Sequence, residues 1–202
     1  MKTMQLRYSK TSPYVRKVRV VAIETGLDAL IDLVETDPHD HNTDLGEVNP
    51  LGKVPTLIAD DGMVLFDSPV ICEYLDSLHG GARVVPVATA SHWLVQRMQS
   101  VGDGIMDAAV AAVMEGRRPI EEQSPGHIAR QKDKINRAIE WLDSHLSDLS
   151  GTLNLGQISV SCALAYLDFR LADLGWRDGH DALGQWQAMM VERPSMKMTR
   201  PE

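Results

Sequence analysis

The pattern of apolar residues changes once along this 202-residue chain, near residue 80, and that change restricts the folds available to it. Before it, apolar runs of period two alternate with segments of helical spacing, which is typical of a mixed α/β layer. After the stretch "GGARVVPVATA" the strand signals stop and only helical stripes follow. The sequence therefore predicts an α/β domain at 1–79, a linker at 80–89 and an all-helical bundle at 90–202.

The α/β domain is predicted to have the element order β-α-β-α-β-β-α around a mixed sheet. Helical connections favour parallel neighbouring strands, whereas Asp60-Asp61-Gly62 between two apolar runs favours a tight antiparallel hairpin. The turn-rich stretch after the second strand is expected to be a loop with one short helical turn. The predicted strands are 4–9, 29–35, 54–60 and 63–66, and the two main helices open at Ser12 and Ser68.

The helical domain is predicted from three long apolar stripes and one shorter helix. Within each stripe the apolar residues are three or four positions apart, so they cover one face of an amphipathic helix. The stripes run from Leu94 to Ala112, from Ile135 to Leu149 and from Val160 to Leu174, and the shorter helix is "HDALGQWQAMMVER" at 180–193.

Composition and charge argue against several classes of protein. With 20 Lys and Arg against 28 Asp and Glu, the net charge is −8, whereas non-specific binding of nucleic acid needs clustered cations. The sequence contains no apolar run of about 18 residues, which a membrane span would need. The N-terminus lacks the apolar core of a signal peptide. Cys72 and Cys162 lie in apolar helical stretches, so we expect reduced thiols and a cytoplasmic protein.

Hydroxyl residues gather where the first predicted strand meets the first helix, in "KTSPYVRKV". Ser12 is a favoured N-cap, and Pro13 suits the first helical position because its missing N–H would have no partner there. A helix start after a strand is also a place where an enzyme holds an anion. Capping alone and a chemical role for Ser9, Thr11 or Ser12 both stay open.

A proline begins the third predicted strand, in "NPLGKVP". Pro55 cannot donate a hydrogen bond to a sheet, and a proline here is a candidate for a cis peptide bond in a tight turn. A cis bond would turn the Val54 N–H and C=O away from the sheet, where an extended peptide could pair with them. The alternative is an ordinary proline at a strand start.

An acidic and a hydroxyl residue precede the second main helix, in "FDSPVICEYL". Ser68 is expected to be the N-cap, with Pro69 as the first helical residue. A helix start can hold a carboxylate, and Asp67 beside it can accept an ammonium group, so together they suit an amino-acid head group. Plain capping is the alternative.

Two other motifs are interpreted as structural. Asn154 and Gln157 in "NLGQ" form the pattern of a capping box before the third long stripe. His39 and His41 lack the further ligands that a zinc site needs, so no metal is expected.

The order and spacing of these motifs resemble the glutathione transferases from about residue 4 to 195. "TSPYVRKV", "NPLGKVPTL", "FDSPVICEYL", "DGIMDAAV" and "ALAYLDFR" are similar to small bacterial members whose first helix opens with Ser-Pro-Phe/Tyr. The resemblance implies a thioredoxin-like N-terminal domain that binds glutathione as co-substrate. The matching positions are Ser12, Lys53, Val54, Pro55, Asp67 and Ser68, with Thr11 and Ser9 as alternates to Ser12.

The resemblance also implies roles for these residues. The Ser12 hydroxyl would stabilise the glutathione thiolate, Val54 would pair with the cysteinyl unit, and Lys53 or a nearby polar residue would meet the glycyl carboxylate. The electrophile would bind between the domains, in an adaptable apolar pocket, whereas Ile105 would face the bundle core. The candidate pocket residues are Tyr14, Asp103, Met106, Asp107, Val110 and Tyr166.

The expected activity is conjugation of glutathione to small hydrophobic electrophiles, as in detoxification, by a homodimer. The alternatives are a glutathione-dependent peroxidase or disulfide-bond reductase, and a non-catalytic interaction protein with the same fold. Ser12 stands where reductase members carry Cys, and serine cannot form their mixed disulfide, so reductase chemistry through this residue is disfavoured.

Overall fold

The chain folds into two compact units in a computed structural model, which describes residues 3–87 and 90–201. One unit comprises Met1–Val85 and Pro194–Glu202, and the other comprises Pro86–Arg193. The sequence placed the last residues with the helical domain, but their contacts group them with the α/β domain. The reason is α8 (Pro194–Met198), a short helix that packs on the first helix of that domain.

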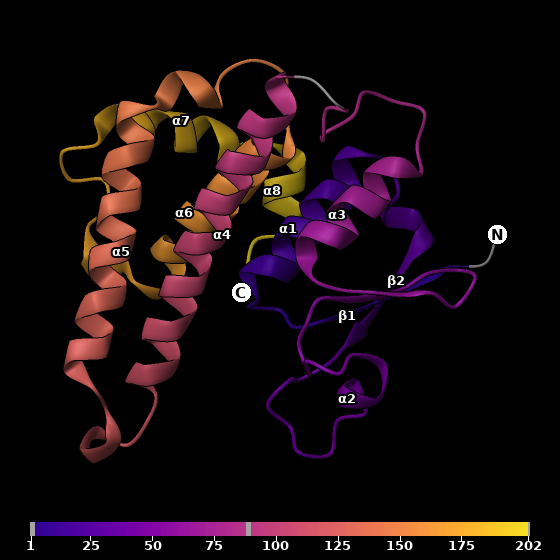
Figure 1. Ribbon diagram of the computed structural model, residues 1–202, viewed down its shortest axis with the longest axis horizontal. Helices are drawn as coiled ribbons and strands as arrows, with labels where there is room; N and C mark the ends of the chain where they lie inside the picture. The colour runs from indigo at the N-terminus through magenta and orange to yellow at the C-terminus, as the bar shows by residue number, and fades with distance from the viewer. Residues whose placement is uncertain (1–2, 88–89, 202) are drawn as a thin grey trace. The chain divides into compact units, whose positions relative to one another are not determined.

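A four-stranded mixed sheet forms the centre of the first unit (Figure 1). Its strands are β1 (Met4–Tyr8), β2 (Ile31–Glu35), β3 (Thr56–Ile58) and β4 (Val64–Leu65), in the order β2-β1-β3-β4. β1 and β2 are parallel and β3 and β4 are antiparallel, as the sequence predicted. β1 and β3 are also antiparallel, a pairing that the sequence did not predict. Gly62 adopts a positive φ of 93° in the β3–β4 turn, which glycine permits at little cost.

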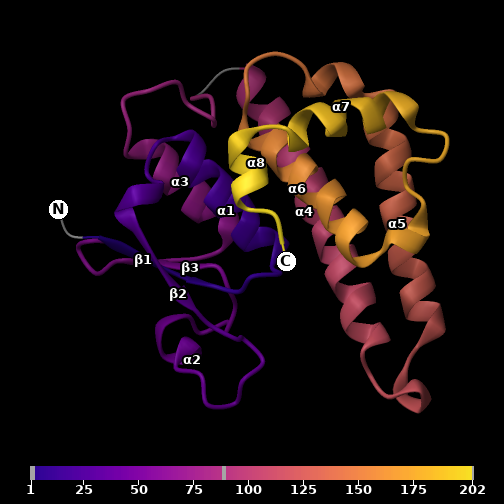
Figure 2. The same cartoon turned by 180° about the vertical axis from the view of Figure 1, so that it is seen from behind.

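The helices of this unit begin close to the predicted positions. They are α1 (Pro13–Glu24), the short η1 (Asp28–Leu30) and α2 (Leu45–Val48), and α3 (Ser68–Ser77). The two views in Figures 1 and 2 place α1 and α3 on one side of the sheet and α2 on the other. The prediction that Ser68 caps α3 is wrong: Asp67 is the N-cap, and Ser68 is the first helical residue.

The C-terminal segment is tied to α1 by a buried arginine. Arg16 is only 8% exposed, and its Nη2 donates to the Met196 carbonyl at 3.0 Å. Its Nε lies 3.5 Å from Thr199 Oγ1, and Ser195 Oγ donates to Glu24 Oε1 at 2.5 Å. Sequence reasoning missed this attachment, because "PSMKM" is too short to show a periodic pattern.

The second unit contains helices joined by loops and turns, with no strand among its described residues. Each predicted long helix is present, but the second and third end before their apolar stripes do and continue into short 3-10 segments. The capping box of Asn154 and Gln157 before the third long helix is confirmed. The elements are α4 (Ala90–Gly116), η2 (Ile120–Glu122), α5 (Pro125–Ser144), η3 (Leu146–Leu149), α6 (Leu155–Arg170), η4 (Ala172–Leu174) and α7 (Asp181–Val191).

Two glycines allow α4 and α6 to approach closely within this unit. A Cβ at Gly102 would lie 2.6 Å from the carbonyl carbon of Ser159, and one at Gly156 would lie 2.6 Å from Met98 Cβ. Gly104, by contrast, has no atom within 4 Å of the position its Cβ would take. The helix pair therefore depends on the missing side chain at the first two positions.

Cys72 and Cys162 are both buried and form no disulfide. Across the described ranges, no helix combines the length and the hydropathy needed to span a bilayer. The same residues contain no group of three or more His, Cys, Asp or Glu placed to hold a metal ion.

Gly102→Ala is expected to lower the free energy of unfolding by about 1–3 kcal/mol, because the helices must separate to admit the methyl group. Gly104→Ala in the same helix is the matched control, and it should raise stability by about 0.5–1 kcal/mol through helix propensity. Urea unfolding followed by circular dichroism measures both. A Gly102→Ala protein as stable as the Gly104→Ala protein would contradict the close approach.

Candidate functional site

The sheet brings three of the predicted motifs to one end of the first unit. β1 ends at Tyr8 and β3 begins at Thr56, and because these strands are antiparallel, both positions lie at the same end. β4 is antiparallel to β3 and ends at Leu65, so it also finishes there. The segments that carry Ser12, Val54-Pro55 and Asp67-Ser68 adjoin these three strand ends.

Ser12 is the N-cap of α1, as predicted. Its Oγ accepts a hydrogen bond from the Val15 N–H at 3.3 Å, so the cap partner is Val15 rather than Tyr14. A serine hydroxyl also carries one hydrogen that it can donate. Within the described part of the chain this hydrogen has no acceptor, and the side chain is half-buried. Capping and a second interaction are therefore compatible.

The Val54–Pro55 peptide bond is cis, as the sequence suggested. Asn49 holds this turn, because its Nδ2 donates to the Lys53 carbonyl at 3.0 Å and to Thr56 Oγ1 at 2.9 Å. The backbone N–H and C=O of Val54 make no hydrogen bond to any other described residue. They are available to an extended peptide.

The side chain of Val54 anchors this turn against the start of α1. Val54 forms a buried apolar cluster with Val15 and Leu45, and Tyr8 and Val48 pack against it. Val15 is also the residue whose N–H bonds to Ser12. One small cluster thus fixes the cis-proline turn beside the first turn of α1.

Asp67 and Ser68 form the start of α3, after a second cis peptide bond at Phe66–Asp67. Asp67 Oδ1 accepts a short hydrogen bond from the Ser68 N–H, while the rest of the side chain is exposed. Ser68 is only 1% exposed, and its Oγ has no hydrogen-bond partner among the described residues. A buried hydroxyl without a partner is uncommon, and here it lies at a helix start that favours anions.

A small pocket lies beside this arrangement in the same unit. It has a volume of ≈ 190 Å³, and its walls include Ser9 and Ser12 from the strand–helix junction and Arg16 from α1. Thr11 is not among the residues that line it. Of the three hydroxyls that sequence left open, Ser12 and Ser9 therefore face a cavity together.

The predicted electrophile residues are spread over both units, and their role stays a prediction. Tyr14 is half-buried on α1, while Asp103 is half-buried and Asp107 exposed on α4. Met106 is fully buried. Val110 is half-buried on the same helix.

Tyr166 on α6 is 7% exposed. Burial raises the pKa of its phenol, and Arg170 and Arg117 act in the opposite direction. Ile105 is 1% exposed, which confirms its expected place in the core. A protonated, buried Tyr166 is consistent with packing as well as with a contact to substrate.

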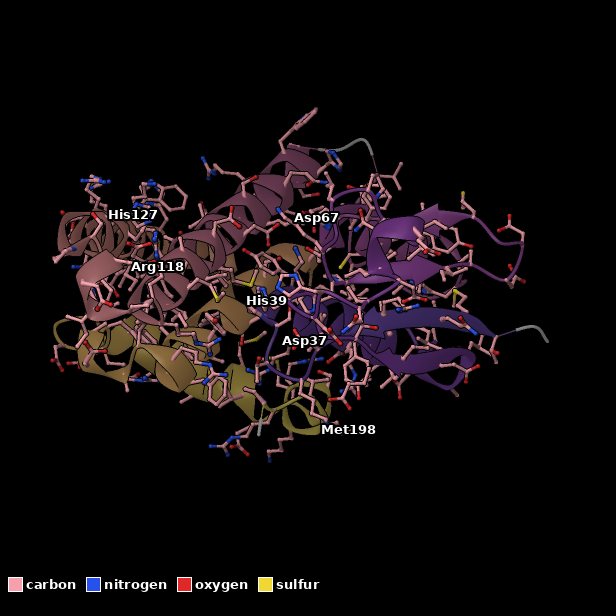
Figure 3. All side chains as sticks on the ribbon, turned by 90° about the horizontal axis from the view of Figure 1, so that it is seen from below. Asp37, His39, Asp67, Arg118, His127 and Met198 are labelled. Atoms are coloured by element: carbon pink, nitrogen blue, oxygen red, sulfur yellow. The ribbon has the colours of Figure 1, made fainter. Side chains whose placement is uncertain are left out.

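The histidines of the loop after β2 are exposed, and no metal cluster of described residues includes them. The backbone N–H of His39 donates to Asp37 Oδ1 at 2.9 Å, and Figure 3 labels both residues. Lys53 is also exposed, with its side chain available to solvent.

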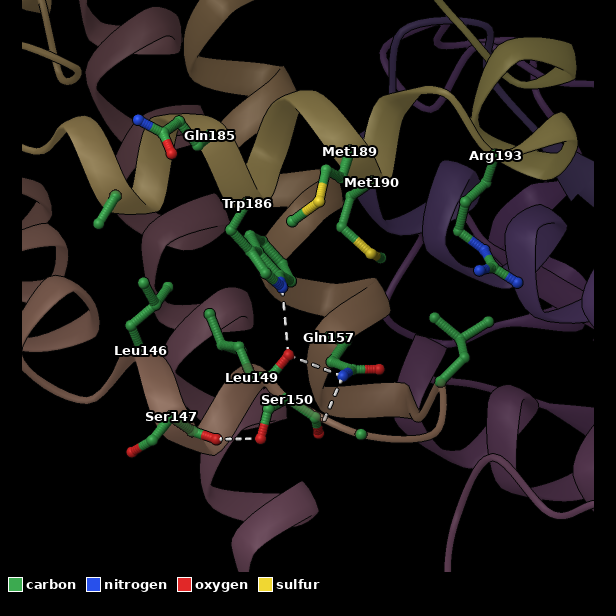
Figure 4. Close-up of a pocket in the computed structure, with 13 residues that line it drawn as sticks. Leu146, Ser147, Leu149, Ser150, Gln157, Gln185, Trp186, Met189, Met190 and Arg193 are labelled. Carbon is green, nitrogen blue, oxygen red and sulfur yellow. Dashed lines mark hydrogen bonds between the residues drawn. The ribbon is translucent and has the colours of Figure 1, made fainter.

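The helical unit has a larger pocket of ≈ 680 Å³, shown in Figure 4. Trp186 Nε1 and Gln157 Nε2 both donate to the Leu149 carbonyl, at 3.1 and 2.8 Å. Among the described residues that line this pocket there is no His, Cys, Asp or Glu. The described residues that line the smaller pocket include none of these types either. The smaller pocket is nevertheless the better candidate, because the Ser12 hydroxyl lies in its wall, close to the cis-proline turn.

Comparison with known proteins agrees with this fold. The family model "Glutathione S-transferase, N-terminal domain" matches residues 11–78, and "Glutathione S-transferase, C-terminal domain" matches 125–186. The uncharacterized GST-like protein YibF of Escherichia coli (strain K12) is 34% identical over 98% of both chains.

Two solved structures of similar proteins carry ligands. A glutathione transferase family member from Pseudomonas fluorescens Pf-5 with bound glutathione is 39% identical, with a TM-score of 0.96 over 99% of this chain and 100% of that one. A structure with bound S-(propanoic acid)-glutathione, from the same organism, is 40% identical, with a TM-score of 0.90 over 98% and 99%.

The first unit has the thioredoxin-like arrangement of a mixed sheet with a cis-proline turn, and it is accompanied by a helical unit. This architecture defines a class of two-domain proteins. The chain belongs to the glutathione S-transferase family within it.

Ser68→Ala is expected to leave the free energy of unfolding of the ligand-free protein unchanged within about 0.5 kcal/mol, or to raise it, because no protein hydrogen bond is lost. Ser12→Ala serves for comparison, since losing its cap bond should cost about 1 kcal/mol. Thermal and urea unfolding without ligand compare the two. A loss of 1 kcal/mol or more in Ser68→Ala would mean that its hydroxyl is paired.

Proposed function

We propose that this protein binds glutathione at the shared end of β1, β3 and β4 and conjugates its sulfur to small electrophiles. The observation that carries the proposal is the set of unpaired polar groups collected there: the Ser12 hydroxyl hydrogen, the Val54 backbone and the Ser68 hydroxyl. Each of these groups suits one part of glutathione. The thiol needs a hydrogen-bond donor, the peptide backbone needs a backbone partner, and the amino-acid head needs an anion site.

The head group of glutathione is assigned to the start of α3. Its carboxylate would accept from the buried Ser68 hydroxyl and the helix N–H groups, and its ammonium would meet the exposed Asp67 carboxylate. The cysteinyl unit would pair with Val54, whose N–H and C=O satisfy an extended peptide in the manner of an added strand. Lys53 would meet the glycyl carboxylate.

Ser12 is assigned to the thiol. A free thiol is mostly protonated at neutral pH, and only the thiolate is strongly nucleophilic. Donation from the Ser12 hydroxyl and the positive end of α1 both favour the thiolate and lower its pKa. The sulfur then forms a bond to the electrophilic carbon, and the thiol proton leaves to solvent. Ser12 stabilises the thiolate and forms no covalent bond.

The relatives support this assignment. A protein 39% identical to this chain holds glutathione, and one 40% identical holds glutathione with a propanoic acid group on its sulfur. A site that accepts an S-substituted glutathione has room for a conjugate beyond the sulfur. We further propose that the protein is cytoplasmic and works as a homodimer. Light scattering tests the dimer, and cell fractionation tests the location.

Ser12→Ala should raise the pKa of bound glutathione thiol by about 1–2 units and lower kcat/KM for conjugation by about 10–100-fold, because one charge-assisted hydrogen bond is lost. Glutathione affinity should change little at a pH low enough for the bound thiol to stay protonated. Ultraviolet absorbance of the thiolate against pH, calorimetry and a conjugation assay measure the three quantities.

Ser9→Ala and Thr11→Ala are the matched controls for this variant, since each removes one neighbouring hydroxyl. If Ser9→Ala raises the thiol pKa and Ser12→Ala does not, Ser9 holds the sulfur. If wild-type protein neither binds glutathione in calorimetry nor accelerates any conjugation, the proposed function is wrong, and an interaction role gains support.

A further inference from the structure

The pocket beside Ser12 is lined by an unusual concentration of cations. Lys10, Arg16, Arg19 and Arg200 all contribute to its walls, and none of its lining residues is acidic. Its volume of ≈ 190 Å³ suits a small group of a few heavy atoms rather than a large apolar ring system. The chain as a whole carries a net charge of −8, so this grouping opposes its overall charge.

The arginines of this pocket come from one face of α1 and from the C-terminal segment. Ser12, Arg16 and Arg19 are spaced at positions 0, 4 and 7, which places them on the same side of a helix. Arg200 comes from the segment that follows α8. The hydrogen bonds of Arg16 to Met196 and Thr199 hold that segment against α1. The pocket is therefore built by the fold and does not consist of scattered surface side chains.

The arginines of this pocket are only partly satisfied by the protein. Arg19 Nε is buried and has no hydrogen-bond partner, and no ion pair to Arg19 occurs among the described residues. Arg16 uses Nε and Nη2 in the bonds to the C-terminal segment, although its guanidinium offers five N–H donors. Lys10 differs, because its Nζ pairs with Glu35 at 3.1 Å and both groups are largely exposed.

Buried donors without acceptors destabilise a protein unless a ligand satisfies them. The guanidinium group presents paired N–H donors that match the two oxygens of a carboxylate. An apolar ligand in this pocket would leave the donors unpaired and would desolvate the charges at a cost. The chemistry of the lining therefore selects an anion.

We propose that this pocket binds a carboxylate on the electrophile, so that the substrates are small anionic electrophiles rather than hydrophobic ones. The inference rests on the proposed conjugation at Ser12, which shares the pocket. Arg19 and Arg200 are the specificity-determining residues, and Arg16 mainly positions the C-terminal segment.

An α,β-unsaturated carboxylate such as acrylate illustrates the reaction. The glutathione thiolate forms a bond to the β-carbon, and the π electrons of the double bond move to the α-carbon, which takes a proton from water. The thiol proton was already released to solvent, so the sum is an addition with no leaving group. The arginine side chains of the pocket would hold the carboxylate, and they would partly neutralise its charge as the α-carbon gains electron density.

The decisive experiment compares two conjugates of nearly the same shape: S-(2-carboxyethyl)glutathione, whose added group is a carboxylate, and S-(2-carbamoylethyl)glutathione, whose added group is an uncharged amide. Calorimetry should show that wild-type protein binds the carboxylate about tenfold or more tightly than the amide. In an Arg19→Gln/Arg200→Gln variant this ratio should fall to about twofold or less, since the charge-assisted donors are gone.

Arg83→Gln is the matched control. It removes one positive charge from the first unit, as the single Arg200→Gln variant does, but Arg83 is no part of the pocket and its Nη1 lies 3.8 Å from Asp76 Oδ2. The ratio of the two affinities should be retained in this variant. Arg200→Gln alone, at an exposed residue, provides a second test if the double variant fails to fold. Arg19→Lys keeps the positive charge, so this variant should retain part of the preference for the carboxylate conjugate.

Each outcome distinguishes this inference from the proposed function. If glutathione and both conjugates bind but the carboxylate is not preferred, or if the preference survives in the double variant, only the inference is wrong. If neither glutathione nor the conjugates bind, the proposed function is wrong and the inference with it. In a conjugation assay the acrylate-to-acrylamide ratio of kcat/KM should fall with the same variants and not with Arg83→Gln.

Discussion

The antiparallel pairing of β1 with β3 is the constraint on which the site depends. β1 is central in the sheet and pairs in parallel with β2 on its other side. Because β3 runs against β1, the start of β3 and the end of β1 adjoin, and the short return through β4 finishes at the same end. Three separate segments of the chain therefore present their polar groups together, each beside the end of a strand.

The unpaired groups at this end show how stability and binding are balanced in the first unit. Ser12 uses an acceptor lone pair to cap α1 and keeps its hydrogen. Ser68 keeps its whole hydroxyl unpaired in a buried position, where a missing partner typically costs about 1–3 kcal/mol. The cluster of Val15, Leu45 and Val54 holds the surrounding backbone, so the site depends on apolar packing for its shape.

Local sequence signals predicted much of this site because they report on short-range chemistry. The Ser12 cap, the cis Val54–Pro55 bond and the Asn154–Gln157 box each follow from a few adjacent residues, and all are present. The cap of α3 was misassigned by one residue, since both Asp and Ser are good N-caps and the pattern alone does not choose between them.

The sequence did not predict the attachment of the C-terminal segment, because this attachment depends on contacts between residues that are far apart in the chain. The packing of α8 on α1 joins residues about 180 positions apart, through Arg16 and Met196. From the sequence alone, Arg16 and Arg19 are indistinguishable from ordinary charged residues on an amphipathic helix. At physiological salt the interaction of exposed charges is screened beyond about 8 Å, so the acidic remainder of the chain acts only weakly in the pocket. The local cations, brought together by the C-terminal segment, therefore decide the charge of a ligand that binds there.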